Sequence, residues 1–250
     1  MANSEPDVAS GVAIVTGGCG GIGQAVVAAL SAHGVRTAVL DPAASASPAN
    51  SQAGGPALAI PCDVRDADEV AAAAVRAADE LGPVTHLVCA AGVVSEAPLA
   101  ELAPAEFRRV VEISLFGTFH AFRAVLPGMA ARGHGTAVAM STGWATKGYP
   151  NGGHYAAAKA GVEALVKSAA LEFAASGVRV NAVAPGPVET PMLTGFPDYH
   201  ERAADRARSI PMGRVGQADD ITGPVLFLLG EDSRYVTGQV VHVNGGLLMP

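Results

Sequence analysis

The sequence predicts a single α/β domain, a doubly wound three-layer sandwich in which helices cover both faces of a parallel β-sheet. Short apolar runs rich in β-branched residues alternate along the chain with longer Ala-rich amphipathic stretches. Each parallel return between neighbouring strands requires a crossover, which is usually a helix. A length of 250 residues, half of them hydrophobic, suits one sizeable core.

The elements follow one another in a regular order. The first residues are polar and lack periodicity, so we expect a frayed tail over 1–10 and one domain over 11–250. The segment 42–56 is rich in Ala, Ser, Gly and Pro, which predicts a loose connection. We predict strands over 12–16, 37–40, 57–61, 86–90, 136–141, 179–184 and 240–243, and helices over 22–32, 70–81, 105–131, 155–175 and 218–229.

Charge and composition exclude several kinds of partner. The formal net charge is -7 and no cluster of Lys or Arg occurs, so nucleic acid finds no basic surface. The stretch 8–35 carries no charged side chain, but several glycines interrupt it and no basic residue precedes it. We therefore expect a buried strand and helix there, not a membrane span or signal peptide, and a small molecule as partner.

The cysteines and histidines predict no metal site. Cys19, Cys62 and Cys89 are odd in number and far apart, which indicates neither a disulfide framework nor a zinc site. The seven histidines show no metal-ligand spacing. Reduced cysteines fit a cytoplasmic location.

A glycine-rich segment follows the first predicted strand and opens the first predicted helix. Glycines let the backbone turn tightly and approach a pyrophosphate, whose charge the helix N-terminus stabilises. This context predicts a Rossmann-type dinucleotide site, whereas a glycine-rich segment alone can be only a tight turn. The residues that we expect to bind the cofactor here are Gly17, Cys19, Gly21, Ile22 and Gly23.

Asp41 ends the second predicted strand, where a dinucleotide fold places the acid that binds the adenosine ribose. A carboxylate there repels a 2′-phosphate, and no Arg or Lys nearby counters it, so we predict NAD (NADH) in preference to NADP. Asp41 could instead cap the turn before Pro42. Asp63 and Val64 are predicted near the adenine, although Asp63 or Asp66 could cap the next helix.

Tyr155 and Lys159 lie one helical turn apart and share one face of a helix. A Tyr with an unperturbed pKa of about 10 carries protons poorly at neutral pH, whereas a neighbouring ammonium favours the phenolate. Lowering that pKa by roughly 3 units takes about 4 kcal/mol, which Lys159 and a cationic nicotinamide ring could supply together. Alone, such a pair is common and indicates nothing.

Combined with the glycine loop, these residues resemble the short-chain dehydrogenase/reductase family, from about Gly11 to Gly246. The segment 16–23 resembles the family's TGxxxGIG loop, and Tyr155 and Lys159 match its YxxxK motif. The segment 181–191 is similar to its PG segment, which would hold the nicotinamide amide. The resemblance adds as cofactor-binding residues Ala90, Ala91 and Gly92, from the NNAG strand motif, and Pro185, Gly186, Val188 and Thr190, from the PG segment.

The resemblance also implies roles in the chemistry. Tyr155 would be the general acid/base, and Lys159 would bind the nicotinamide ribose hydroxyls and lower the pKa of Tyr155. A hydroxyl group would orient the substrate oxygen from Thr142, with Ser141 as its fallback. Family members are commonly tetramers joined through two long helices, so we expect a homotetramer that uses 105–131 and 155–175.

Two positions depart from the family pattern. Ser114 stands where the family has an Asn that anchors a proton-relay water, and Cys89 replaces the first Asn of the NNAG motif. Ser114 could hold that water, with fewer hydrogen bonds than Asn. These departures motivate a second hypothesis, a catalytically weak NAD-binding module with a regulatory role. An enoyl-reductase variant would need a Tyr at the position of Gly152.

The substrate is expected beyond the carboxyl ends of the strands, against the nicotinamide. The segment 187–211 is predicted to be a movable lid, or otherwise an ordinary surface loop. Lys147 could meet a substrate anion or be simply solvated, and Trp144 could be ordinary loop packing. The candidate pocket residues, mostly apolar or aromatic, are Val93, Val94, Trp144, Tyr149, His154, Met192 and Phe196. We therefore predict an NAD-dependent oxidoreductase that interconverts a secondary alcohol and a ketone on a small, hydrophobic or cyclic substrate.

Overall fold

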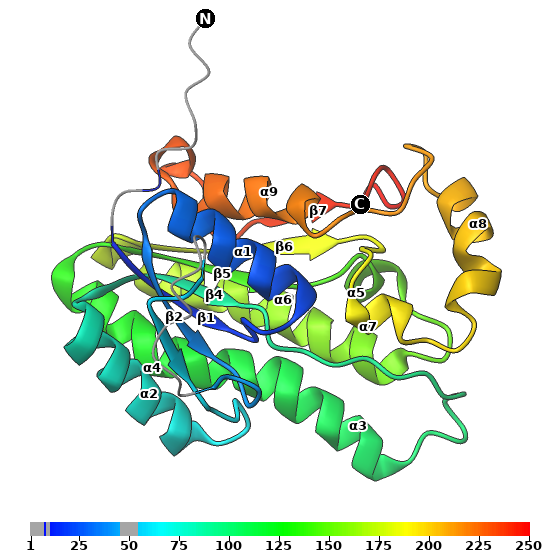
Figure 1. The fold of residues 1–250 in the computed structure, drawn as a ribbon, viewed down its shortest axis with the longest axis horizontal. Helices are drawn as coiled ribbons and strands as arrows, with labels where there is room; N and C mark the ends of the chain where they lie inside the picture. The colour runs from blue at the N-terminus through cyan, green and yellow to red at the C-terminus, as the bar shows by residue number, and fades with distance from the viewer. Residues whose placement is uncertain (1–7, 9–10, 46–54) are drawn as a thin grey trace, which may run out of the picture.

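Seven parallel strands form one sheet in the computed structural model, which describes residues 8, 11–45 and 55–250. Across the sheet the order is β3-β2-β1-β4-β5-β6-β7 (Figure 1). Every strand matches a predicted one, so the predicted fold class is confirmed. The strands are β1 (Val12–Thr16), β2 (Arg36–Leu40), β3 (Leu58–Ile60), β4 (Val84–Cys89), β5 (Gly135–Met140), β6 (Val178–Pro185) and β7 (Val240–Val243).

Helices cover both faces of the sheet, as the sequence predicts. On one face lie α1 (Gly21–Ala32) and α9 (Asp219–Leu229) (Figure 1). They bury side chains such as Leu30 and Leu228. On the other face, α2 (Ala67–Leu81), α4 (Gly117–Arg132) and α6 (Gly153–Phe173) bury a second apolar cluster. Each fully buried Leu or Val stabilises the fold by about 1.5–3 kcal/mol, so these two layers hold the sheet rigid beneath the site.

The predicted helix 105–131 is not one continuous α-helix. It consists of α3 (Pro104–Val111), a π-helical turn η1 (Glu112–Phe116) and α4. By length and composition this run is apolar enough to cross a membrane, but α4 packs Phe122, Leu126 and Met129 into the core. Its hydrophobicity is therefore explained by burial against the sheet.

Of the predicted frayed tail over 1–10, the structure describes only Val8. Residues 1–7 and 9–10 lie outside the described residues, whereas Val8 is 5% exposed and packs in the core with α1 and α9. Val8 thus belongs to the domain, because its side chain is apolar. Of the predicted loose connection 42–56, residues 46–54 also lie outside the described part.

The segment 187–211 is mostly helical. It contains α7 (Pro191–Thr194) and α8 (Tyr199–Ser209), and α8 stands apart from the sheet in Figure 1. Three further short helices are α5 (Trp144–Lys147), η2 (Ala174–Ser176) and η3 (Glu231–Ser233). Residues 187–211 follow the carboxyl end of β6, so they lie at the edge of the sheet where α/β folds bind ligands.

Candidate active site

The glycine-rich turn lies at the switch point of the sheet, because β1 has β2 on one side and β4 on the other. Gly17 has φ +68, and a Cβ there would approach the Ala91 backbone nitrogen to 2.5 Å. A Cβ on Gly23 would clash with the Gly17 carbonyl oxygen. The first turn of α1 has no side-chain cap, so its N–H groups remain available. The glycines of this turn carry no side chains, and the helix N–H groups have no side-chain cap, so the turn fits the pyrophosphate of a dinucleotide.

Asp41 caps the turn after β2 and also lines the cleft. One carboxylate oxygen accepts a hydrogen bond from the Ala43 N–H at 2.8 Å, which caps the turn after β2. The other accepts from the Cys19 N–H at 3.1 Å and so tethers the glycine loop. A carboxylate can accept further hydrogen bonds beyond these two, and Asp41 lines the cleft. Capping the turn and facing a ribose are therefore compatible.

Asp63 and Asp66 have separate functions in the fold. Asp66 caps α2 by accepting from the Asp68 and Glu69 N–H groups. Asp63 instead forms an ion pair with Arg65, and both line the cleft with Val64. The Arg65 guanidinium holds the pKa of Asp63 below its usual range. Of the two capping alternatives, the structure selects Asp66.

One cleft of about 1140 Å³ collects residues from every predicted part of the site. Of the predicted site residues, Cys19, Ser114 and His154 do not line it. Those that do are Gly17, Gly21, Ile22, Gly23, Asp41, Asp63, Val64, Ala90, Ala91, Gly92, Val93, Val94, Ser141, Thr142, Trp144, Tyr149, Tyr155, Lys159, Pro185, Gly186, Val188, Thr190, Met192 and Phe196.

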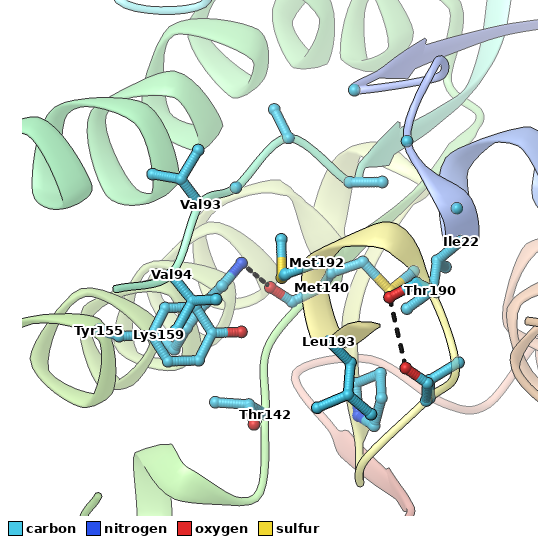
Figure 2. Close-up of a pocket in the computed structure, with 18 of the residues that line it drawn as sticks. Ile22, Val93, Val94, Met140, Thr142, Tyr155, Lys159, Thr190, Met192 and Leu193 are labelled. Carbon is cyan, nitrogen blue, oxygen red and sulfur yellow. Dashed lines mark hydrogen bonds between the residues drawn. The ribbon is translucent and has the colours of Figure 1, made fainter. Parts of the chain in front are cut away.

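Tyr155 and Lys159 lie on one wall of the cleft, opposite Ile22, Thr190 and Leu193 (Figure 2). The Lys159 ammonium is 6.0 Å from the centre of the Tyr155 ring. It donates a hydrogen bond of 2.7 Å to the Met140 carbonyl at the end of β5. This bond fixes a buried cation, 3% exposed, at the floor of the cleft.

Burial sets the proton affinities of this pair in the protein alone. It raises the pKa of Tyr155 to about 12, although the Thr142 hydroxyl opposes the shift by hydrogen bonding. It lowers the pKa of Lys159 to about 8, because the ammonium is taken out of water. We expected Lys159 to lower the pKa of Tyr155, and in the protein alone burial outweighs any such effect.

The two candidate hydroxyl groups after β5 point to different partners. The Ser141 hydroxyl donates to the Glu163 carboxylate on α6 at 2.6 Å, so it is engaged inside the protein. Thr142 is 7% exposed, and its oxygen accepts from the Trp144 N–H at 3.4 Å, a long bond. Thr142 is therefore the freer hydroxyl beside Tyr155.

Ser114 lies beneath the cleft and not on its wall. It belongs to the π-helical turn η1 and is fully buried, and its hydroxyl has no hydrogen-bond partner in the described structure. A Cβ added to Gly92 would lie 3.4 Å from the Lys159 nitrogen and 3.5 Å from the Ser114 oxygen. The two polar atoms therefore face a common space below Gly92. Cys89 lies nearby, and burial raises the pKa of its thiol to about 12, so it stays neutral.

The substrate end of the cleft has an aromatic wall. Trp144 and Tyr149 stack with ring centres 4.7 Å apart and planes 9° from parallel. The Tyr149 hydroxyl donates to Glu96, and the Lys147 ammonium lies 4.7 Å from the centre of the Trp144 ring. Trp144 and Lys147 thus both reach the cleft. Flat aromatic surface of this kind suits a ring-shaped substrate.

His154 and Cys19 correct the sequence prediction. His154 is fully buried, and its Nε2 atom lies 2.8 Å from the Ser95 hydroxyl, which donates to Glu106 on α3. It follows Gly153 on the face of α6 that packs away from the cleft, so it is a core residue. Cys19 contributes its backbone N–H to Asp41, while its side chain packs against the α1 and α9 core.

Several residues at the cleft were not foreseen from the sequence. Most come from loops or from the lid, where no periodic pattern tells which side faces inward. Arg109 on α3 could have been found only from the packing of α3 on α6. The unforeseen residues are Gly20, Leu40, Pro42, Arg65, Glu96, Arg109, Ile113, Met140, Pro187, Pro191, Leu193, Asp198, Asp205, Arg206, Ser209 and Leu247.

Comparisons with known proteins agree with this geometry. A family model described as enoyl-(acyl carrier protein) reductase matches residues 17–248. The chain is 41% identical over 239 residues to a cis-4-hydroxycyclohexanecarboxylate dehydrogenase of Sinomonas cyclohexanicum, covering 94% of this chain and 95% of that protein. It is 36% identical over 236 residues to a 2-dehydro-3-deoxy-L-rhamnonate dehydrogenase (NAD(+)) of Sphingomonas sp. (strain SKA58), covering 94% of both.

The same agreement holds for solved structures. A crystal structure of a short-chain type dehydrogenase/reductase from Mycobacterium marinum matches with a TM-score of 0.89 and 30% identity, covering 98% of each chain. The matches span almost the whole length of the chain, including the glycine loop, Tyr155 and Lys159. The chain therefore belongs to the short-chain dehydrogenase/reductase family and is an oxidoreductase of a family that binds a nicotinamide cofactor.

Proposed function

We propose that this protein uses NAD(H) to interconvert a secondary alcohol and the corresponding ketone on a small, hydrophobic or cyclic substrate. The observation that carries the proposal is that Tyr155, Lys159 and Thr142 meet on one side of a cleft that begins at the glycine-rich turn. The aromatic wall of Trp144 and Tyr149 supports a ring-shaped substrate. The hydroxycyclohexanecarboxylate dehydrogenase relative gives a precedent for a hydroxyl carried on a ring.

Each residue has one task in this proposal. When bound, the nicotinamide ring accepts hydride from the alcohol carbon or returns it to the ketone. Tyr155 takes the hydroxyl proton in one direction and gives it back in the other. Thr142 holds the substrate oxygen beside the phenol, and Lys159 donates to the ribose hydroxyls. The segment from Pro185 to Thr190, which lines the cleft after β6, holds the nicotinamide amide.

Ser114 is proposed to connect Lys159 with a water. Its buried hydroxyl has no partner among the described residues and faces the same space as the Lys159 ammonium. A buried water needs several polar partners, and the Ser114 hydroxyl and the Lys159 ammonium would be two of them. This arrangement supports a proton path that leaves the cleft beneath Gly92.

The other hypotheses receive less support. The weak regulatory module gains none from the relatives, which are named dehydrogenases or reductases. The matching family model is described as an enoyl reductase, but seven residues before Lys159 the chain has Gly152, which does not line the cleft. Tyr155, one turn before Lys159, supports carbonyl chemistry instead.

The substitution Asp41→Asn tests the cofactor preference. It removes the negative charge that repels a 2′-phosphate, while the remaining carbonyl oxygen can still accept one backbone hydrogen bond. The variant loses the proposed charged hydrogen bond between the carboxylate and the adenosine ribose of NAD. The ratio of kcat/KM with NADP to kcat/KM with NAD should therefore rise roughly tenfold or more. Initial rates with both cofactors on one alcohol measure it. Asp79→Asn, on the exposed face of α2, is the matched control, and an unchanged ratio in Asp41→Asn would reject the assignment.

The direction of the reaction should depend on pH. Tyr155 stays protonated at neutral pH because burial raises its pKa to about 12, so it serves ketone reduction as an acid. Alcohol oxidation needs the phenolate and should accelerate as the pH rises. Reduction should slow as the pH rises through about 8, where Lys159 loses its proton. Profiles of kcat/KM for the cofactor report the free enzyme. A reduction rate that increases with pH would contradict the assignment.

We extend the proposal to the lid, the assembly and the location. The segment 187–211 closes over the substrate, and the Tyr199 and Gln217 side chains, both bonded to Glu189, fix its start. Copies associate as tetramers through the two long helices, where Phe119 and Leu171 are exposed. A cytoplasmic location fits the three free cysteines.

The test of the proposed function is turnover on a panel of cyclic and aromatic alcohols and ketones, with NAD and NADP in parallel. We expect formation or consumption of NADH with at least one ring-borne alcohol or ketone. Turnover with NADP alone would overturn the cofactor assignment. Binding of NADH without turnover of any panel member would overturn the proposed reaction. It would favour the second hypothesis, a catalytically weak NAD-binding module.

A further inference from the structure

Among the arginines that line the cleft, one has no ion-pair partner in the described structure. Three arginines line the cleft, and two of them are neutralised, Arg65 by Asp63 and Arg109 by Glu106. The third, Arg206 on the lid helix α8, has a buried Nη1 atom without a hydrogen-bond partner among the described residues. Buried guanidinium donors are normally satisfied, so this one points to a missing acceptor.

The protein holds Arg206 in place without neutralising it. Its guanidinium carbon lies 5.7 Å from the centre of the Tyr199 ring, a cation–π contact. Tyr199 is buried and hydrogen-bonded to Glu189, so it is a firm support. The contact orients the guanidinium but leaves its N–H groups free.

The acids at this end of the cleft have other partners. Glu96 accepts from the Tyr149 hydroxyl, and Asp205 pairs with Arg208 on the same helix. Asp198 lies about two turns before Arg206, at the start of α8. Neither Glu96 nor Asp205 supplies the acceptor that Arg206 lacks.

Arg206 also lies at a useful position relative to the reacting groups. Arg206 lines the same cleft as Tyr149 and Tyr155. Tyr149 stacks on Trp144, and both line the cleft. The aromatic wall, Tyr155 and the unpartnered nitrogen of Arg206 therefore belong to one cleft.

We propose that the substrate carries a carboxylate, which Arg206 binds at the end of the ring away from the reacting carbon. A planar guanidinium offers paired donors that match the two oxygens of a carboxylate. The substrate class is thus an alicyclic hydroxy acid and the matching oxo acid, with the ring against Trp144 and Tyr149. This inference rests on the proposed function and names its substrate.

The test compares a hydroxycyclohexane carboxylate with its methyl ester, which keeps the ring and removes the charge. The wild type should prefer the acid by roughly tenfold or more in kcat/KM, through KM. Arg206→Gln should lower kcat/KM for the acid roughly tenfold to a hundredfold and leave the ester unchanged. Arg206→Lys should recover part of the loss, because it restores the charge without the planar pair of donors.

The control is Arg36→Gln, which removes an exposed arginine at the start of β2, outside the cleft lining. It should leave both substrates unaffected. Equal use of acid and ester by the wild type, or an equal loss on both in Arg206→Gln, would overturn the proposal. Turnover of cyclohexanol and the ester, but without preference for the acid, would leave the proposed function intact and remove only this inference.

If no compound turns over, a binding measurement distinguishes failure of the proposed reaction from failure of the proposed carboxylate site. With NADH present, cyclohexanecarboxylate should raise the thermal midpoint of the wild type and not that of Arg206→Gln, whereas the neutral carboxamide should raise neither. A shift by the acid would support the carboxylate site while the proposed reaction failed. Equal shifts by acid and amide, or none by either, would reject the carboxylate site.

Discussion

Replacing Tyr155 with Phe should lower kcat by roughly a hundredfold to ten-thousandfold, the range for removing a general acid/base. The change deletes one hydroxyl on the wall of the cleft and leaves the ring that packs near Lys159. The hydroxyl also bonds with Thr142, so the variant loses about 1 kcal/mol of stability at most from that bond. NADH should still bind, since the glycine-rich turn and Asp41 are untouched.

The measurement is a steady-state rate together with NADH binding followed by fluorescence. Tyr235→Phe is the matched control, because Tyr235 is fully exposed and its hydroxyl lies outside the cleft lining. The control should keep the wild-type rate. A Tyr155→Phe enzyme with a near wild-type rate would mean that another group handles the proton, and the assignment of Tyr155 would fall.

Replacing Lys159 with Met should separate activity from stability. Methionine fills a similar volume but carries no charge. The variant therefore does not bear the cost of burying an ammonium group. Burial lowers the pKa of Lys159 to about 8, so keeping this lysine charged in the folded protein costs roughly 3 kcal/mol. We therefore expect an equal or higher thermal midpoint, although the bond to the Met140 carbonyl is lost. Activity should fall roughly a hundredfold or more, because the ribose ligand and the cation beside Tyr155 both disappear.

Lys167→Met controls for the loss of a lysine from α6. Lys167 lies two turns further along the helix and is exposed, so its replacement should affect neither rate nor thermal midpoint. Thermal unfolding and initial rates on the same preparations give both results. A Lys159→Met enzyme that is inactive because it is unfolded would contradict this account of a lysine retained for function at a cost in stability.

The fold could be predicted because its signals are local. Buried parallel strands are short apolar runs, and the glycine turn sits between a strand and a helix, so periodicity and glycine positions were sufficient. The predicted strands all occur in the structure, with ends that differ by a few residues at most. The spacing of Tyr155 and Lys159 places them on one helical face, but only its combination with the glycine loop, in the resemblance to the family, singled them out.

The errors arise where the direction of a side chain depends on its surroundings. His154 precedes Tyr155 by one residue and so points about 100° away around α6, toward Ser95. The predicted helix begins at Tyr155, whereas α6 begins at Gly153, so the sequence prediction gave His154 no helical direction. Ser114 lies in a π-helical turn, which displaces side chains from α-helical spacing and leaves no signal in the sequence.

The remaining gaps concern long-range contacts. Arg206 comes from the helix α8 and lines the cleft together with Tyr149 and Trp144, which are more than fifty residues away in the sequence. Helical spacing pairs Arg208 with Asp205 three residues earlier, but nothing in the local pattern of 199–209 shows that Arg206 lines the cleft. The pKa of Tyr155 was likewise beyond the sequence, because it depends on how much water the folded wall excludes.

The most direct test of the central claim is the fate of a deuterium placed on the carbinol carbon of a cyclic secondary alcohol. With NAD and the wild-type protein, we predict that the deuterium is recovered in NADH by mass spectrometry, and that Tyr155→Phe transfers almost none in the same time. Ketone formation in which the deuterium appears in water and not in NADH, or transfer that proceeds equally in Tyr155→Phe, would contradict a hydride transfer that depends on Tyr155.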